Sequence, residues 1–440
     1  MTEVKVSSAT GMHDILPKNH DFFNMVKKVI RHRCRQAGFR RITTPIFEKM
    51  DTIKKSFPET ADLVERHLYA LRDPGGEDLV VRPSNTIGIA RAYCEHNFAD
   101  YPQPISLYYI EQQARYTDKP GYYRFFNQFG TEVLGHNDPA LDAQVVYLAY
   151  KIFSDLKIMD RLDIQINSFG SREVKENYLA ELRSFFDSKR RSVPDEYEHF
   201  IERDPIQLFL IDDEDLEILC QMAPKVEDYW DDESKKYFEL FKEYLDELNI
   251  PYTVNTNFFR KQSYYSGVIF EFWEKNRGRK KAVGGGGRYD NLIERLGGEP
   301  QAACNFIGGI ERIIAQMKIS KVVVPSKDDL HVFVAQLGVE AKKKCLSLLG
   351  KLHDQGIKAI GAIGKSSMKE QISMAERFKV PYMILMGLTE VREGKAIIRE
   401  MSKGTQKSIE IDKVPKEMIK LLGKENLDKY SPADGINIDK

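Results

Sequence analysis

The chain has 440 residues, a length that fits two to three domains of about 150 residues each. Its 66 basic and 66 acidic residues give a formal net charge of zero, so any contact with nucleic acid would need local basic patches. The five cysteines are far apart and form no Cys-x-x-Cys pair, which argues against a zinc site and against a disulfide framework.

Neither a signal peptide nor a membrane span is predicted. The first residues contain no apolar run of the signal-peptide kind, and no apolar stretch reaches the ~18 residues that a membrane helix needs. We therefore expect a soluble, cytoplasmic protein with reduced cysteines and no membrane contact.

The first predicted elements are a helix and two strands that stop at prolines. The helix is expected from about His20 to Gln36, and the apolar strand after it ends at Pro45. A second strand, Val80 to Arg82, leads through Ser84 into the helical run Ile87 to Cys94.

The segment from Ile105 to Gly135 is the most informative part of the sequence. It reads as a strand, a polar turn cluster and a second strand. Side chains alternate along a strand, so the face of the second strand should carry Arg124, Phe126, Gln128, Gly130 and Glu132. Such a polar row suits a pocket that holds an anion at one end and a small polar group at the other. The alternative is the solvated face of an edge strand.

The chain between about Ser171 and Asn249 is charged and rich in predicted helices. Apolar residues recur three and four positions apart in Glu173 to Phe186, Asp213 to Ala223 and Ser234 to Leu248. A predicted strand precedes this segment and another follows it, so it can be an insertion that leaves the sheet undisturbed.

Beyond Asp329 strands and helices alternate, which predicts a mixed α/β sheet of about one hundred residues. Ser366 and Ser367 stand near a capping-box spacing from Glu370. The segment from Lys395 to Ile398 is expected to pair with Gln406 to Glu410. The polar residues after Lys424 are expected to be disordered.

Seven segments, in this order, carry a resemblance to a known family. They are Gly11 to Pro17, Thr44 to Glu48, Arg82 to Thr86, Tyr108 to Gly135, Arg260 to Tyr265, Gly286 to Asp290, and Gly309 to Arg312. Over about residues 7–423 the chain resembles the class II aminoacyl-tRNA synthetases and, within them, the histidyl-tRNA synthetase family.

The resemblance implies an α+β catalytic domain with an antiparallel sheet, a helical insertion, and a C-terminal α/β mixed-sheet domain like an anticodon-binding domain. The boundaries we expect are 1–315 for the catalytic domain, with 171–249 as its insertion, 316–329 for a linker, 330–423 for the C-terminal domain and 424–440 for the tail.

The implied activity is that of a histidine–tRNA ligase. Such an enzyme activates histidine with ATP to an adenylate and transfers it to tRNA, with Mg²⁺ entering on ATP and no metal held by the protein itself. The partners implied are histidine or another small amino acid, ATP, tRNA, and a second copy of the chain in a homodimer.

Joining a carboxylate to the α-phosphorus of ATP brings two anions together, so the site must supply cations with defined geometry. Arginine suits this role because its planar fork binds carboxylate and phosphate oxygens. By resemblance, Arg260 is the catalytic cation, and the ATP-binding arginines are Arg115, Arg124 and Arg312.

The residues that the resemblance assigns to the amino-acid pocket are Ser84, Thr86, Gln128, Glu132, Tyr264 and Tyr265. A carboxylate can accept a hydrogen bond from one imidazole nitrogen while a tyrosine hydroxyl serves the other. The glycines Gly284–Gly287 fit neither common phosphate-loop pattern, and we interpret them as a strand packed closely against the ligand.

Several positions depart from the family pattern. Ser84 stands where the family has the acidic residue that receives the ammonium group, and Asn85 replaces a glycine. Ala114 takes the place of the leading arginine, with Arg115 one residue later, and Tyr122 replaces the loop arginine. Residues 261–263 read Lys-Gln-Ser in place of Gly-Leu-Asp.

These departures leave a second hypothesis open. The chain could be a non-charging paralogue that binds tRNA, histidine or another small amino acid in a regulatory role. The altered ammonium site favours this alternative, whereas the well-matched C-terminal domain favours a role connected with tRNA in either case.

Overall fold

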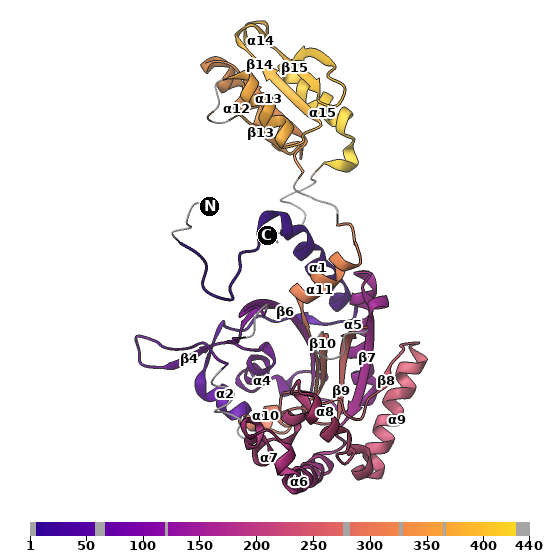
Figure 1. Ribbon diagram of the computed structural model, residues 1–440. Helices are drawn as coiled ribbons and strands as arrows, with labels where there is room; N and C mark the ends of the chain where they lie inside the picture. Colours follow the sequence, from indigo (N-terminus) through magenta and orange to yellow (C-terminus); the bar gives the residue numbers. More distant parts are fainter. Residues whose placement is uncertain are drawn as a thin grey trace. The chain divides into compact units, whose positions relative to one another are not determined.

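The computed structural model describes residues 6–57, 67–118, 122–275, 282–324, 329–362, 364 and 367–427. The chain forms two compact units, Met1–Val324 and Pro325–Lys440 (Figure 1). Part of the expected linker and residues 428–440 of the expected tail lie outside the described residues.

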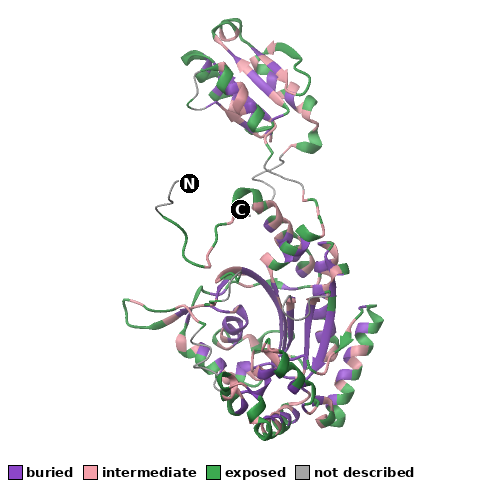
Figure 2. Ribbon diagram, viewed as in Figure 1, coloured by how far each residue is buried: buried purple, intermediate pink, exposed green. Residues whose placement is uncertain are grey.

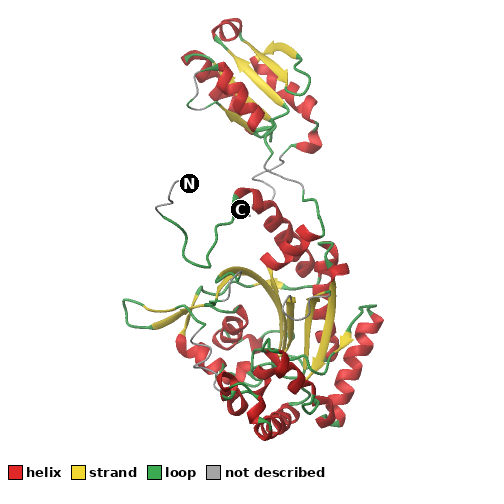
Figure 3. Cartoon of the chain, viewed as in Figure 1, coloured by secondary structure: helices red, strands yellow, loops and turns green. Residues whose placement is uncertain are grey.

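An eight-stranded sheet forms the centre of the first unit (Figure 3). In spatial order its strands are β1 (Arg40–Arg41), β5 (Ile105–Ala114), β6 (Phe125–Leu134), β11 (Ala303–Gly309), β10 (Ala282–Arg288), β9 (Val268–Glu274), β7 (Leu162–Ser168) and β8 (Thr253–Val254). The six central strands pair antiparallel, and the edge strands β1 and β8 pair parallel to their neighbours. The predicted strand–loop–strand segment is confirmed, since β5 pairs with β6 from Ile105↔Leu134 to Ala114↔Phe125.

One face of this sheet is covered by an apolar layer of helices. They are α1 (Pro17–Gln36), α5 (Pro139–Asp155), α9 (Asp232–Glu247) and α11 (Ile310–Ile319). Aromatic side chains of the strands and helices, among them Phe153, Phe272 and Phe306, fill the space between, and the sheet is buried along most of its length (Figure 2). This face therefore contributes packing rather than a site.

Helix α9 belongs to this layer although it lies in the segment expected to be an insertion. Its buried residues Phe238, Phe241 and Leu245 recur at helical spacing and join the same apolar cluster as α5 and the sheet. The last part of the helical segment is thus a component of the main core.

The opposite face of the sheet carries shorter helices and the polar residues. The helices are α2 (Met50–Ser56), α4 (Asn85–Glu95), α6 (Arg172–Ser188), α7 (His199–Arg203), α8 (Glu214–Gln221) and α10 (Leu292–Arg295). A small antiparallel sheet of β2 (Phe47–Lys49), β4 (Asp78–Val81) and β3 (Ala70–Arg72) lies beside them. No helix among the described residues is long and apolar enough to cross a membrane.

A buried ion pair joins the large sheet to the helical layer. Arg288, at the end of β10, donates to Asp142 of α5 at 2.7 Å, and both side chains are almost fully buried. The hydroxyl of Tyr237 in α9 donates to the same carboxylate at 2.8 Å. The pair therefore connects three elements that are distant in sequence.

The described residues of the second unit form a five-stranded mixed sheet accompanied by helices. Its strands, in spatial order, are β13 (Ala359–Gly361), β12 (Val332–Gln336), β14 (Tyr382–Met386), β15 (Lys395–Glu400) and β16 (Gln406–Glu410). The helices are α12 (Val339–His353), α13 (Met368–Arg377), α14 (Leu388–Glu393) and α15 (Val414–Leu422).

This unit confirms the strand–helix alternation and the predicted pairing of its last two strands. The helix-capping prediction is not borne out at Ser367, because this residue precedes α13 but its side chain makes no capping hydrogen bond. Ser366 lies outside the described residues.

Asp142→Ala is expected to lower the free energy of unfolding of the first unit by about 3–5 kcal/mol, because it leaves the Arg288 charge buried without its main partner. Urea unfolding followed by tryptophan fluorescence measures this loss, since the two tryptophans, Trp230 and Trp273, lie in this unit. In the control Asp163→Ala, which removes an exposed partner of Lys275, the loss should stay below about 1 kcal/mol. Equal losses in the two variants would contradict the prediction.

Candidate active site

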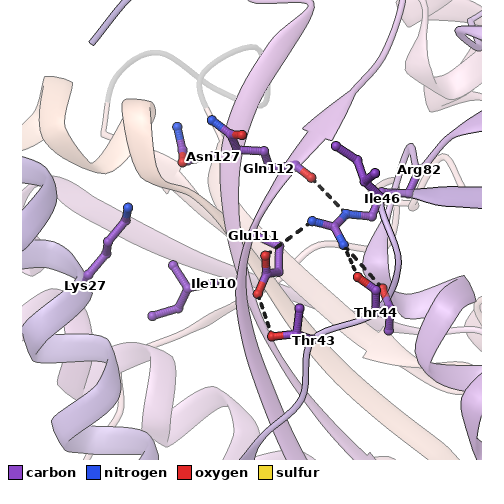
Figure 4. A pocket seen from close by; sticks show the side chains of 9 residues that line it. All are labelled: Lys27, Thr43, Thr44, Ile46, Arg82, Ile110, Glu111, Gln112 and Asn127. Carbon is purple, nitrogen blue, oxygen red and sulfur yellow. Dashed lines mark hydrogen bonds and ion pairs between the residues drawn. The ribbon is translucent and has the colours of Figure 1, made fainter. Parts of the chain in front are cut away.

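The polar site lies where the N-terminus of α4 meets β5 and β6. Arg82 fixes the approach to this helix, because its guanidinium donates to the Thr44 carbonyl at 2.6 Å, to the Gln112 carbonyl at 3.0 Å and to Glu111 at 3.3 Å. Figure 4 shows these contacts in a pocket of about 490 Å³ at the sheet edge. Arg82 is therefore a structural residue that holds the following turn, Pro83–Ser84, in place.

Glu132 of β6 is fully buried, and hydroxyl groups hold both of its oxygens. Thr86 donates to Oε1 at 2.7 Å, and Tyr289 donates to Oε2 at 2.6 Å. Burial raises the pKa of Glu132 to about 8, although hydrogen bonds from Tyr289, Thr86 and Asn305 act in the opposite direction. Burial therefore disfavours the charged form of this side chain while no cation faces it.

A continuous chain of hydrogen bonds joins Glu132 to Arg260. Thr86 Oγ1 accepts from Asn305 Nδ2 at 3.1 Å, and Asn305 Oδ1 accepts from the Tyr265 hydroxyl at 3.1 Å. The Tyr265 oxygen in turn accepts from Arg260 Nη2 at 3.4 Å. Five side chains from separate parts of the sequence are therefore held in one buried polar row.

Tyr264 extends the aromatic wall of this row. Its ring centroid lies 4.9 Å from that of Tyr265 and 6.0 Å from that of Tyr289, and burial raises the pKa of both Tyr264 and Tyr265. Gln128, two residues before Gly130 in β6, accepts from the Tyr109 hydroxyl at 2.9 Å. A ligand ring at this end would thus meet a carboxyl and several tyrosine side chains.

Arg260 forms an ion pair with Glu271 of β9. Burial opposes its charge, but Tyr265 and Glu271 outweigh that effect and raise the pKa of Arg260. A Cβ at Gly285 would lie 2.5 Å from Arg260 Nη1 and 2.6 Å from the Phe270 carbonyl oxygen, so a residue without a side chain is required there. The glycine-rich strand β10 accordingly makes room for the arginine.

Arg115 and Arg312 are the next two candidate arginines. Arg115 donates to the Pro83 carbonyl at 2.8 Å, and burial lowers its pKa, with a further lowering by the charges of Arg312 and Arg260. Arg312 lies on the exposed side, donates to the Ala282 carbonyl and approaches the Tyr122 ring to 6.0 Å. Arg115, Arg260 and Arg312 therefore contribute to one region of positive potential.

Arg124 lies at the outer end of the β5–β6 hairpin, where its carbonyl accepts from the Arg115 amide at 2.8 Å. It donates to the Thr117 carbonyl at 2.7 Å, and its guanidinium lies 4.3 Å from the Tyr116 ring centroid.

Ser84 precedes α4 and Asn85 is the first residue of that helix, and their side chains are incompletely paired. Asn85 Oδ1 accepts from Gln113 Nε2 at 3.0 Å. Within the described part of the chain, the Ser84 hydroxyl, Asn85 Nδ2 and Gln113 Oε1 are buried and have no hydrogen-bond partner.

The structure thus brings together the predicted residues Thr86, Glu132, Tyr264, Tyr265 and Arg260, with Gln128 close by. Sequence reasoning missed Asn305, which joins Thr86 to Tyr265, and it missed Tyr289 and Tyr109, which donate to Glu132 and Gln128. Tyr289 belongs to the motif Gly286 to Asp290, and Asn305 is a polar residue in the otherwise apolar strand β11. Both features are visible in the sequence and could have identified these residues as candidates.

A groove of about 510 Å³ opens beside Arg260 and runs along α6. Basic side chains predominate in its lining, with Arg172, Lys175, Arg183, Arg203 and Arg295 set against Glu176, Asp204 and Glu294. In the described ranges no group of three or more His, Cys, Asp or Glu side chains gathers as a metal site would require.

Comparison with known proteins places this geometry in a family. Residues 11–313 match the family model described as histidyl-tRNA synthetase, and residues 323–421 match the anticodon binding domain. The histidine–tRNA ligase of Dehalococcoides mccartyi is 32% identical over 409 residues, which are 92% of this chain and 97% of that protein. That of Halothermothrix orenii is 32% identical over 420 residues, which are 95% and 100% of the two chains.

A solved structure agrees with these matches. The apo histidyl-tRNA synthetase of S. aureus superposes with a TM-score of 0.79 at 28% identity, covering 94% of this chain and 99% of that one. The fold, the order of the motifs and the full-length similarity confirm the resemblance seen in the sequence, and the chain belongs to the histidyl-tRNA synthetase family.

Proposed function

We propose that the chain is a histidine–tRNA ligase, which activates histidine with ATP and transfers it to tRNA. The observation that carries this proposal is the hydrogen-bonded row from Glu132 to Arg260. It places a group suited to an imidazole at one end and a cation suited to a carboxylate or phosphate at the other. The full-length similarity to proteins named as ligases favours catalysis over the binding-protein alternative.

In the first step a histidine carboxylate oxygen attacks the α-phosphorus of ATP and pyrophosphate leaves. Arg260 stabilises the charge that gathers on the α-phosphate, and Arg115 and Arg312 add positive potential for the remaining phosphate oxygens. Mg²⁺ enters as part of the ATP complex. Arg124 is assigned to ATP from its place at the rim of the hairpin.

The imidazole of histidine lies against Glu132, Tyr264 and Tyr265 in this proposal, with Ser84, Thr86 and Gln128 around the α-carbon. Ionised Glu132 would be a buried anion without a cation, so the bound state holds one proton shared between Glu132 and the imidazole. A neutral acid beside a neutral ring and a carboxylate beside an imidazolium both satisfy this condition.

In the second step a hydroxyl at the end of tRNA attacks the histidyl carbonyl, and AMP leaves. The C-terminal unit, which matches the anticodon binding domain, supplies a second point of contact for tRNA. The basic groove beside Arg260 is suited to the phosphates of the acceptor end. We assign this reaction to the cytoplasm.

Histidine is expected to stimulate ATP–pyrophosphate exchange, and Arg260→Ala should reduce this exchange by about 10²–10³, the usual loss for one preorganised donor to the transition state. Arg260→Lys keeps the charge opposite Glu271 and should recover part of the rate. The control Arg190→Ala removes a cation bound to surface carboxylates and should leave exchange unchanged. An exchange rate that stays the same in Arg260→Ala would refute the assignment of Arg260 as the catalytic cation.

The affinity for histidine should be highest between about pH 6.5, the usual pKa of free imidazole, and the pKa of Glu132 of about 8. Below this window histidine must release a proton to bind, and above it Glu132 must take one up. Calorimetry from pH 5.5 to 9 measures the loss of affinity on both sides of this window. In Glu132→Gln, which cannot titrate, the loss on the alkaline side should disappear. An affinity that rises steadily through pH 8 would show that the complex holds no shared proton.

The small sheet β2–β4–β3 supports a homodimer, because Ile46, Phe47 and Leu71 expose apolar surface on it. Light scattering at micromolar concentration should give twice the chain mass of 50.8 kDa. Phe47→Asp should shift the protein toward the monomer, whereas Val323→Asp, a matched change at another exposed apolar residue, should not. A monomer for the unmodified protein contradicts the dimer.

A further inference from the structure

Ser84 and Asn85 stand between the two ends of the proposed substrate pocket. On one side the carbonyl of Pro83 accepts from Arg115 at 2.8 Å, and on the other Thr86 donates to Glu132 at 2.7 Å. The turn therefore lies between Arg115, on the side proposed for the anionic end of a ligand, and Glu132, on the side proposed for its ring.

The polar atoms at this turn are neutral and lack partners. Asn85 and Gln113 are fully buried, and their mutual hydrogen bond satisfies one amide group of each. Asn85 Nδ2, Gln113 Oε1 and the Ser84 hydroxyl remain without a partner in the described part of the chain. Because buried polar atoms are nearly always paired, these three atoms point to a ligand group or to water that they would bind.

Among the described carboxylates of this region, none makes a hydrogen bond with the Ser84 hydroxyl, Asn85 Nδ2 or Gln113 Oε1. Glu271 is paired with Arg260, Glu111 binds Arg82 and Thr43, and Glu311 accepts from Asn127. Burial raises the pKa of Glu132 and so disfavours its charged form. An ammonium group would lose its hydration at this turn, gain no opposite charge, and meet the positive potential of Arg115 and Arg260.

We propose that the site does not select its substrate by the α-ammonium group and therefore also activates imidazole carboxylic acids that lack it. This inference rests on the proposed function, because it concerns the same pocket. A carboxylate oxygen of the acid forms a bond to the α-phosphorus of ATP, the bond from that phosphorus to the bridging oxygen breaks, and pyrophosphate carries away the electron pair. The products are an acyl-adenylate and pyrophosphate.

The test compares histidine with imidazolepropionate, its analogue without the amino group, in ATP–pyrophosphate exchange by the full chain. We expect kcat/KM for imidazolepropionate to lie within about threefold of that for histidine, or above it. A preference for histidine of tenfold or more overturns the inference and leaves the proposed function standing.

Ser84→Glu supplies the missing anion. It should raise the ratio of kcat/KM for histidine to that for imidazolepropionate by about 10- to 100-fold, the range for one hydrogen bond to a charged group. Ser408→Glu makes the same change on an exposed strand of the second unit and should leave the ratio unaltered. An unchanged ratio in Ser84→Glu that is correctly folded by circular dichroism also counts against the inference.

If neither compound stimulates exchange, the proposed function fails, and direct binding then decides the inference. Calorimetry with ATP present should give dissociation constants for the two compounds within about threefold of each other. Binding of histidine alone, or a tenfold preference for it, overturns the inference in that case as well.

Discussion

The buried hydrogen-bonded row from Arg260 through Tyr265, Asn305 and Thr86 to Glu132 is the constraint on which the site depends. Its members come from the loop before β9, from β11, from α4 and from β6. Each donates to or accepts from the next, so a displacement of one leaves a neighbour unpaired in a region that excludes water. The strands and the helix must therefore keep one relative position, and the two ends of the pocket keep a fixed separation.

The two faces of the large sheet allow this arrangement. One face is sealed by aromatic and aliphatic side chains beneath α1, α5, α9 and α11, which leaves the polar residues of alternate positions on the other. Glycines bring the backbone of that face close to the site. A Cβ at Gly130 would lie 2.5 Å from the Tyr109 ring, so the tyrosine that bonds Gln128 depends on this residue having none.

The sequence predicted the local elements and the residues within each motif. The alternation of β6 correctly placed Gln128 and Glu132 on the face of the site, and the C-terminal alternation of strands and helices is confirmed. The partners of these residues were harder to predict, because they depend on the tertiary arrangement. Asp142 and Arg288 are 146 residues apart, and the bond from Tyr289 to Glu132 spans 157, so no local spacing reveals either contact.

Helix α9 has a consequence for how the helical segment can vary. It closes that segment, yet its Phe241 and Leu245 are part of the core beneath the sheet, and Tyr237 bonds the buried Asp142. At the other end α6 contributes Tyr178 and Leu182 to the core of the opposite face. The two ends are thus anchored on different sides of one sheet. Between them Ile201, Leu208 and Leu216 are buried in the same core as α6, so excising 171–249 would open both faces of the sheet.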